Sequence, residues 1–411
     1  MSLTLSPAEA LPASVLEALR ASLHTPPSAA RALPAACYKD PAVHDLEQQL
    51  IFGHDWIPLA HVSQLPKPGD FVTVDVGDEP LIVTRGKDGH IRVLSRICQH
   101  RGVDMLPNQA ARHCGQGNTP LLRCPYHLWN YDLTGQLIAA PEMAGSSCHA
   151  MEKVKLPEFR SEIAEGFIFV TFKASSPPLA SLLHTLSSGY LAKYGLGDAE
   201  VVWSRHWECD FNWKVLAENF MEPYHHLGAH RTTLQPFLPA RFCVTEPTAD
   251  EQHMAVRLPL EAGIRARIQT TGQPEPGFTP FPSLTLADHL DWWVTMAFPA
   301  FLLFLAPDRA FWYRLLPTGP ETCSLLTTML VHPAARAAPD YAEQLARAEE
   351  EAIAFHLEDM QICSAIQRGV RGRGYTRGAL SPLEEPLLHI QRYLARRLAP
   401  PAHTPVLSMT A

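Results

Sequence analysis

The sequence predicts an α+β protein in which a small antiparallel β domain precedes a larger domain that ends in a long helix. Short β-rich runs, separated by glycine and aspartate turns, occupy residues 56–172, a texture typical of a small antiparallel domain. Further strands are expected through about residue 332, and helical periodicity follows from about Tyr341 to Arg368, closed by Gly369. At roughly 150 residues per domain, 411 residues allow two or three domains.

The elements are expected in a simple order along the chain. A short helix over 15–23 leads into an arm rich in proline and alanine. Strands of the first domain are expected at 71–76, 81–84, 91–94 and 167–172. Because Ser175–Pro178 has the composition of a linker, the predicted division is an N-terminal arm 1–50, a first domain 51–174, a second domain 175–398 and a proline-rich tail 399–411.

Composition excludes several classes of protein. Charged residues make up 18% and hydrophobic residues 46%, which favours a folded globular chain over disorder. The 34 basic and 42 acidic residues give a net charge of −8, which argues against a nucleic-acid partner. Nine cysteines are too sparse for a disulfide scaffold. The N-terminus has no secretory pattern, and the most apolar stretch, 292–306, is shorter than the roughly 20 residues of a membrane span. We therefore expect a cytoplasmic protein without a membrane partner.

Two cysteine–histidine pairs lie in the first domain. Cys98 and His100 form a Cys-x-His pair, and Cys124 and His127 form a Cys-x-x-His pair. Two thiolates and two imidazoles are the ligands of a Rieske [2Fe–2S] cluster, in which both cysteines bind one iron and both histidines bind the other. The segment 128–137 also resembles the second loop of a Rieske site. The pattern predicts such a cluster, with a structural zinc site as the alternative.

The interval between the two pairs is unusual. Twenty-three residues separate His100 from Cys124, which is longer than the usual Rieske interval. The excess falls in the polar stretch 108–118, which contains His113 and Cys114. A glycine stands three residues beyond Cys114, so no second Cys-x-x-His pair forms there. We expect Cys114 to be a bystander in the loop.

A second cluster of histidines and carboxylates occupies residues 218–230. Two imidazoles and one carboxylate form the facial triad of non-haem Fe(II) oxygenases, which leaves positions open for O₂. His226 and His230, four residues apart, share a face of a continuous helix. His225 and His230, five apart, lie on one side only if the helix breaks near Gly228. Spacing leaves both pairs open, and structural histidines are a further alternative.

The carboxylate of this triad is expected from the long C-terminal helix. An apolar face is predicted by four residues that recur at spacings of four, three and four: Phe355, Asp359, Ile362 and Ile366. A carboxylate on such a face is costly to bury unless it is paired or bound to a metal. Glu358 is expected on a polar face with Glu351 and Gln361. Asp359 is therefore the predicted third ligand, and a capping or salt-bridged aspartate is the alternative.

Together these motifs resemble the Rieske non-haem iron oxygenases, the family of aromatic-ring-hydroxylating oxygenase α-subunits. The resemblance covers about residues 50–395 and is carried by the cysteine–histidine pairs, by 212–214 and 218–230, and by the helix around Asp359. It implies a Rieske domain and a catalytic domain in which a curved antiparallel sheet grips a long helix. It also favours His225 and His230 as iron ligands with Asp359.

The resemblance implies that the cluster and the catalytic iron that work together belong to two different subunits. In this family the cluster of one subunit lies near the catalytic iron of its neighbour in a head-to-tail trimer, so a homotrimer is expected. An acidic residue, here Glu222, would bridge His127 of one chain to His225 of the next by accepting hydrogen bonds from both. Glu222, Asn219 and His226 are the predicted catalytic residues beside the metal ligands. Glutamate at this place resembles the carnitine and glycine-betaine monooxygenases, whereas many aromatic-ring dioxygenases carry aspartate.

The expected reaction uses O₂ and two electrons. No Gly-x-Gly-x-x-Gly motif and no second Fe–S motif is present, so we expect a separate NAD(P)H-dependent reductase of flavin or ferredoxin type. The substrate is a small organic molecule, with ring hydroxylation and oxidative demethylation both open. Four aromatic residues are candidates either for a cage around a methylated cation or for ordinary strand positions: Trp292, Trp293, Trp312 and Tyr313. A Rieske electron carrier with a non-catalytic C-terminal binding domain is the alternative function.

Overall fold

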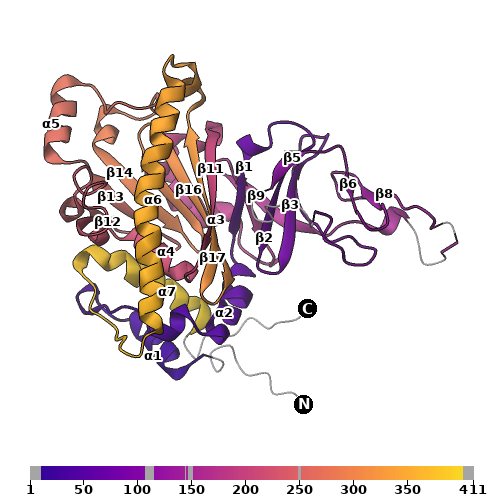
Figure 1. Cartoon of the computed structure of the whole chain (residues 1–411), viewed down its shortest axis with the longest axis horizontal. Helices are drawn as coiled ribbons and strands as arrows, with labels where there is room; N and C mark the ends of the chain where they lie inside the picture. Colours follow the sequence, from indigo (N-terminus) through magenta and orange to yellow (C-terminus); the bar gives the residue numbers. More distant parts are fainter. Residues whose placement is uncertain (1–10, 107–114, 144, 147–150, 249–250, 401–411) are drawn as a thin grey trace.

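The computed structural model describes residues 11–106, 115–143, 145–146, 151–248 and 251–400. It confirms the α+β class. Figure 1 shows a smaller β domain beside a larger domain whose face is crossed by the long helix α6 (Tyr341–Arg371). The predictions about His113 and Cys114, and about the tail from residue 401 onward, lie outside the described residues.

The smaller domain contains two antiparallel sheets. Seven strands form the main sheet in the order β1-β10-β9-β4-β3-β2-β5, and a three-stranded sheet has the order β6-β7-β8. The strands span Ile57–His61 (β1), Asp70–Val76 (β2), Glu79–Arg85 (β3), Ile91–Ser95 (β4), Gln116–Asn118 (β5), Leu122–Arg123 (β6), Asn130–Tyr131 (β7), Leu137–Ala139 (β8), Glu158–Ala164 (β9) and Phe167–Thr171 (β10). All four predicted strands are present. The other six strands of this domain were not predicted individually.

The larger domain is built on a second seven-stranded antiparallel sheet, in the order β11-β17-β16-β15-β14-β13-β12. Its strands span Glu200–Cys209 (β11), Val244–Glu246 (β12), His253–Pro259 (β13), Asp291–Ala297 (β14), Phe301–Ala306 (β15), Arg309–Gly319 (β16) and Thr322–Val331 (β17). The most apolar stretch of the sequence forms β14 and β15, as expected of buried strands. Over the described part of the chain, no helix is both long and apolar enough to cross a membrane.

Seven α-helices accompany the three sheets within the described ranges. They span Ala13–Ser22 (α1), Pro41–Glu47 (α2), Leu179–Ser188 (α3), Trp213–Met221 (α4), Ala262–Thr271 (α5), Tyr341–Arg371 (α6) and Glu385–Leu398 (α7). Helix α6 begins where the sequence predicts but ends later than expected. It continues through Gly369 to a C-cap at Gly372, because Val370, which is 2% exposed, holds the last turn against its neighbours.

The buried face of α6 differs from the predicted one. It is formed by Ala348, Ala352, His356, Cys363, Gln367 and Val370. Ile362 and Ile366 are 38% and 41% exposed, so their assignment to the apolar face was wrong. The helix approaches its neighbours through small residues, and the larger isoleucines therefore remain outside. Asp359 still lies on the buried side, three residues after His356 and four before Cys363.

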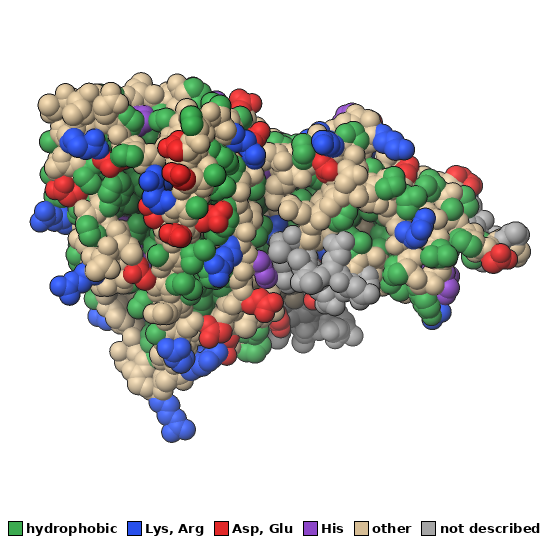
Figure 2. All heavy atoms as spheres, turned by 45° about the horizontal axis from the view of Figure 1, so that its top comes forward, with side chains coloured by type: hydrophobic (Ala, Val, Ile, Leu, Met, Phe, Trp, Pro, Cys, Tyr) green, Lys and Arg blue, Asp and Glu red, His purple; other side chains and the backbone are tan. Residues whose placement is uncertain are grey.

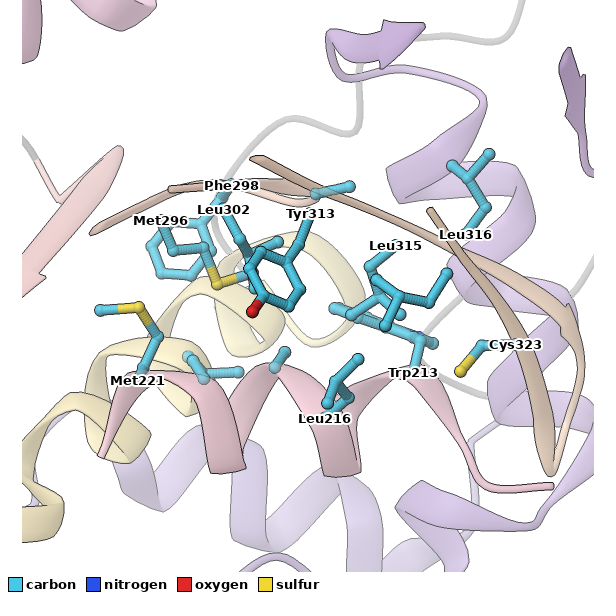
Figure 3. Close-up of a cluster of buried hydrophobic side chains, with 14 of the residues drawn as sticks. Trp213, Leu216, Met221, Met296, Phe298, Leu302, Tyr313, Leu315, Leu316 and Cys323 are labelled. Carbon is cyan, nitrogen blue, oxygen red and sulfur yellow. The ribbon is translucent and has the colours of Figure 1, made fainter. Parts of the chain in front are cut away.

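Helix α4 packs against the large sheet. Figure 3 shows Trp213, Leu216 and Met221 of this helix facing strand side chains that include Tyr313 and Leu315. The helix begins at Asn212, whose side chain accepts a hydrogen bond from the amide of Lys214. Its far end carries Glu222 and leads directly into the histidine cluster, so the packing of α4 fixes the start of the candidate metal site.

The N-terminal arm is joined to α4 by a buried ion pair. Lys214 Nζ donates to Glu47 Oε1 at 2.6 Å, and both side chains are fully buried. Trp213 Nε1 donates to the second oxygen, Glu47 Oε2, at 2.8 Å.

On the outside of the molecule, acidic and basic side chains are interspersed over the face in Figure 2.

We expect Glu47→Ala to destabilise the protein by about 3–5 kcal/mol, because it leaves the ammonium of Lys214 buried and unpaired. Urea unfolding followed by intrinsic fluorescence measures the shift. Lys155→Ala is the matched control, since it removes an ion pair with Glu158 in which both side chains are more than a third exposed, and it should cost no more than about 1 kcal/mol. Equal effects of the two substitutions would contradict the anchoring role of Glu47.

Candidate functional site

The predicted Rieske ligands come together at the tip of the smaller domain. Cys98 follows β4 and Cys124 follows β6, and both are buried. The Nδ1 atoms of His100 and His127 lie 3.1 Å apart. Tyr131 lies behind the pair of cysteines, with its hydroxyl 3.4 Å from the sulfur of Cys98. Two buried thiols and two half-buried imidazoles that turn the same nitrogen toward each other fit the donor set of a [2Fe–2S] cluster.

The second site begins where α4 ends. After Met221 the backbone becomes extended at Glu222, and a short 3₁₀ helix covers Tyr224–Leu227. The carbonyl of His225 accepts from the amides of Gly228 and Ala229, which closes this turn. The helix therefore breaks at the glycine, and this break is the condition under which His225 and His230 can face the same side.

His225, His230 and Asp359 form a separate group of residues that could hold a single metal ion. One donor atom from each lies within 4.8 Å of the others. Asp359 Oδ1 is 3.0 Å from His230 Nε2 and 3.6 Å from His225 Nε2. This buried oxygen nevertheless has no partner in hydrogen-bonding geometry. A buried acceptor oxygen that lies between two imidazole nitrogens is an arrangement suited to binding a cation.

The charges in this group stabilise one another. Burial by itself would raise the pKa of Asp359, but His230 and His225 outweigh it, and the pKa lies below its usual value. Burial lowers the pKa of His230, but Asp359 and Glu358 outweigh it and raise the pKa overall. The site therefore favours a carboxylate in contact with positive charge.

His225 and His230 each have a carboxylate at Nδ1, the ring nitrogen that faces away from Asp359. His225 Nδ1 lies 3.0 Å from Glu222 Oε1, and the backbone amide of His225 donates to Glu222 Oε2. His230 Nδ1 lies 2.7 Å from Glu358 Oε2. Glu358 was predicted on a polar face of α6, and its side chain is indeed 30% exposed, but this contact with His230 was not predicted. Helical periodicity missed its role because the partner comes from the segment after α4, far away in sequence.

The other two predicted catalytic residues lie close to the ligands. His226 is 5% exposed, and its ring centre lies 5.0 Å from that of His225. Its Nδ1 donates to the carbonyl of Leu238 at 3.0 Å, and burial, reinforced by His225, lowers its pKa to about 3. His226 is thus a neutral ring outside the group of three. Asn219 is buried on α4, one turn before Glu222.

A cavity of about 420 Å³ lies beside the group of three. Aromatic rings line it at Phe237, Trp292, Phe304, Phe311 and Phe355. Its charged lining residues are Glu275, Asp308, Glu351, Arg309 and Arg347. The ring centre of Phe355 lies 6.4 Å from that of His230, and Thr233 also lines the cavity. The three residues of the group do not themselves line the cavity. A mostly apolar cavity next to a group of possible metal ligands is the expected form of a small-molecule site.

The four aromatic residues proposed as a cage are not together. Only Trp292 lines the cavity. Trp293 stacks on Tyr190 at 4.3 Å, Trp312 is fully buried in a second hydrophobic cluster, and Tyr313 packs in the main core. Of the two alternatives left open for these residues, ordinary strand positions are confirmed and a shared cage is not, because consecutive residues of a strand point to opposite faces of a sheet.

These features define a class: a redox metalloprotein with a Rieske-type donor set in one domain and a two-histidine, one-carboxylate site in another. The sequence model of the Rieske [2Fe-2S] domain matches residues 55–159, and that of the ring hydroxylating alpha subunit (catalytic domain) matches residues 196–400. The glycine betaine monooxygenase oxygenase subunit of Chromohalobacter salexigens is 30% identical over 384 residues, or 85% of this chain and 81% of the relative. The chain belongs to the Rieske non-haem iron oxygenases, as an α-subunit-type terminal oxygenase.

Other relatives cover both branches of the family. The alpha subunit of biphenyl 2,3-dioxygenase from Rhodococcus jostii is 31% identical over 228 residues, covering 53% of this chain and 48% of the relative. A quaternary ammonium Rieske monooxygenase has the same fold, with a TM-score of 0.76 at 21% identity over 94% of this chain and 98% of its own. Naphthalene 1,2-dioxygenase from Rhodococcus sp. superposes with a TM-score of 0.77 at 22% identity, covering 96% and 100%. The cofactors of the family are a [2Fe–2S] cluster and a mononuclear iron, with electrons from a reductase.

Proposed function

We propose that Cys98, His100, Cys124 and His127 hold the [2Fe–2S] cluster and that the site around Asp359 holds the iron. When bound, this iron supplies the O₂ and redox chemistry of a non-haem oxygenase. The protein contributes a buried carboxylate, two imidazoles with their second nitrogens already engaged, and a cavity with an aromatic wall. The unpartnered oxygen of Asp359 between His225 and His230 is the observation that carries the assignment.

The substrate is proposed to bind in the cavity beside His230. Phe355 lines this cavity and lies one helical turn before Asp359, so a molecule held against its ring would lie close to the metal ligands. Three of the charged lining residues are acidic and two are basic. These carboxylates are already paired with arginines, Glu275 with Arg267 and both Asp308 and Glu351 with Arg309. The aromatic wall is therefore the feature that favours an organic cation.

The reaction proposed first is therefore oxidative demethylation of a methylated amine, in which O₂, two electrons and two protons convert an N-methyl group to N–H, formaldehyde and water. Glu222 in place of aspartate, together with the glycine betaine relative that covers most of the chain, supports this choice. Hydroxylation of an aromatic ring is the second candidate, favoured by the five aromatic rings of the cavity.

Electrons are proposed to reach the iron from the cluster of a neighbouring subunit in a homotrimer. Figure 1 shows β6 and β8 at the right-hand side of the molecule, in the part of the smaller domain that points away from α6. Next to the ligand His127, Tyr126 and Leu128 are 52% and 53% exposed. Next to Glu222, Tyr224 is 46% exposed. Apolar side chains exposed at both sites support a contact between them in the assembly.

We further propose that the domain boundary lies in the segment 175–178 and that the protein works in the cytoplasm. Strand β10 ends at Thr171 and α3 begins at Leu179, which leaves this segment as the connection. All seven cysteines in the described ranges are free thiols, which suits a reducing compartment.

His225→Ala should remove the mononuclear iron and leave the cluster intact. Iron falls from about three to about two atoms per chain, while about two sulfides and the Rieske absorption spectrum remain, and product formation falls to background. Elemental analysis and visible spectroscopy on anaerobically purified protein measure this. His184→Ala, at an exposed position on α3, is the matched control. Full activity in His225→Ala would refute the ligand assignment.

Glu222→Gln should keep both metal centres but slow electron transfer between subunits. Loss of the charged bridge between imidazoles is expected to reduce cluster oxidation in a single turnover by about 10–100-fold. Stopped-flow absorbance of the pre-reduced protein gives the rate, and Glu350→Gln, an exposed substitution on α6, should leave it unchanged. A normal single-turnover rate in Glu222→Gln would argue against the bridge.

The substrate class is tested with an isosteric pair, choline and its neutral carbon analogue 3,3-dimethylbutan-1-ol. If the aromatic wall recognises a cation, choline should bind about 2–30-fold more tightly, and turnover with reductase, NADH and O₂ should release formaldehyde. Tighter binding of the neutral analogue, with no formaldehyde from choline or glycine betaine, would favour hydroxylation of an aromatic ring. Biphenyl and naphthalene would then be assayed as substrates.

A further inference from the structure

Two consecutive residues of α6, Glu358 and Asp359, contact the two ring nitrogens of His230. Asp359 Oδ1 lies 3.0 Å from Nε2, and Glu358 Oε2 lies 2.7 Å from Nδ1. We propose that Glu358 is a positioning residue that sets the orientation and tautomer of His230, and that Thr233 ties this support to the wall of the substrate cavity. The proposal rests on the ligand assignment made above.

The geometry around Glu358 is specific. A single oxygen, Oε2, accepts both from His230 Nδ1 at 2.7 Å and from Thr233 Oγ1 at 2.7 Å. The side chain of His230 is 1% exposed, whereas that of Glu358 is 30% exposed. The histidine therefore has no access to water as an alternative partner for Nδ1, while the carboxylate keeps part of its hydration. An N–H that is buried without a partner is costly, so Glu358 determines where the proton of this ring resides.

The consequence concerns the opposite nitrogen. With the proton on Nδ1 and donated to Glu358, Nε2 carries the free lone pair and faces Asp359. A metal-binding imidazole needs this arrangement, and a carboxylate on the second nitrogen also raises its basicity. Because Glu358 and Asp359 are neighbours on one helix, any shift of α6 moves both of them together. The carboxylate that binds the metal and the carboxylate that orients His230 therefore move as one unit.

His225 is supported differently. Its carboxylate, Glu222, lies three residues away in the same segment and is 11% exposed. His230 instead depends on a contact between α6 and the segment after α4. Thr233 adds a link to function, because it lines the cavity and donates to the same carboxylate oxygen. Thr233, a residue of the cavity wall, is thus hydrogen-bonded to the carboxylate that orients His230.

The test measures binding of Co(II) as a probe to protein that retains its cluster but has been stripped of mononuclear iron. Glu358→Leu should weaken Co(II) binding by about 10–100-fold and change the visible spectrum of the bound ion. Glu358→Gln keeps an acceptor oxygen and should restore most of the affinity. Glu350→Leu, an exposed substitution on the same helix, should leave the affinity and the spectrum unchanged.

Thr233 is tested in the same assay. Thr233→Val removes one of two hydrogen bonds to Glu358 and should weaken Co(II) binding by about fivefold, whereas Thr233→Ser, which keeps the hydroxyl, should not. If Thr233 acts through Glu358, adding Thr233→Val to Glu358→Leu should cause no further loss.

The outcomes separate this proposal from the ligand assignment. Unchanged Co(II) affinity and spectrum in Glu358→Leu, in protein with a normal Rieske spectrum and melting temperature, would overturn the role of Glu358. If Glu358→Leu does not fold, wild-type Co(II) affinity and spectrum in both Glu358→Ala and Thr233→Val would overturn it equally. His225→Ala serves as the reference, since Co(II) binding that survives this substitution would refute the ligand set itself.

Discussion

The negative charge of Asp359 is held on the buried side of α6, and the cost of removing a carboxylate from water governs how the surrounding residues are arranged. An isolated buried carboxylate costs several kcal/mol even after relaxation. Here the compensation comes from His225 and His230, whose Nε2 atoms face Oδ1 at 3.6 and 3.0 Å. The oxygen still lacks a hydrogen bond, and a cation bound there would satisfy it. The remainder of the catalytic domain serves to bring these residues to one place.

Three structural features bring them together. The large sheet holds α6 through small residues such as Ala352 and Cys363, which permits close approach. Helix α4 is anchored by the buried pair of Lys214 and Glu47 and ends next to Glu222. The chain then breaks, and this break turns two histidines of unsuitable helical spacing toward α6. With carboxylates at both Nδ1 atoms, the imidazoles are oriented before any metal binds, which lowers the cost of binding it.

The parts of the site that could be predicted are those encoded over short distances. The two cysteine–histidine pairs need only a few residues each, and the length of α6 follows from its periodicity. Errors arose where a side chain depends on what packs against it. The buried face of α6 is rotated relative to the expected one, which leaves Ile362 and Ile366 outside. Glu358 looks like a surface residue until His230 is placed beside it, and strand alternation separates Trp292 from Trp293.

The sequence by itself determined the class of fold, and it predicted the donor types of both candidate metal sites with Asp359 as the carboxylate, because these rest on residue chemistry and on spacing within single segments. Tertiary structure decided that His225 rather than His226 faces His230, that Glu358 supports the ring of His230, and that an aromatic cavity lies at Phe355. The physical reason is the same in each case. The direction in which each of these side chains points depends on the helix break after α4 and on the rotation of α6 against its neighbours. Packing between segments that are distant in the chain determines both the break and the rotation.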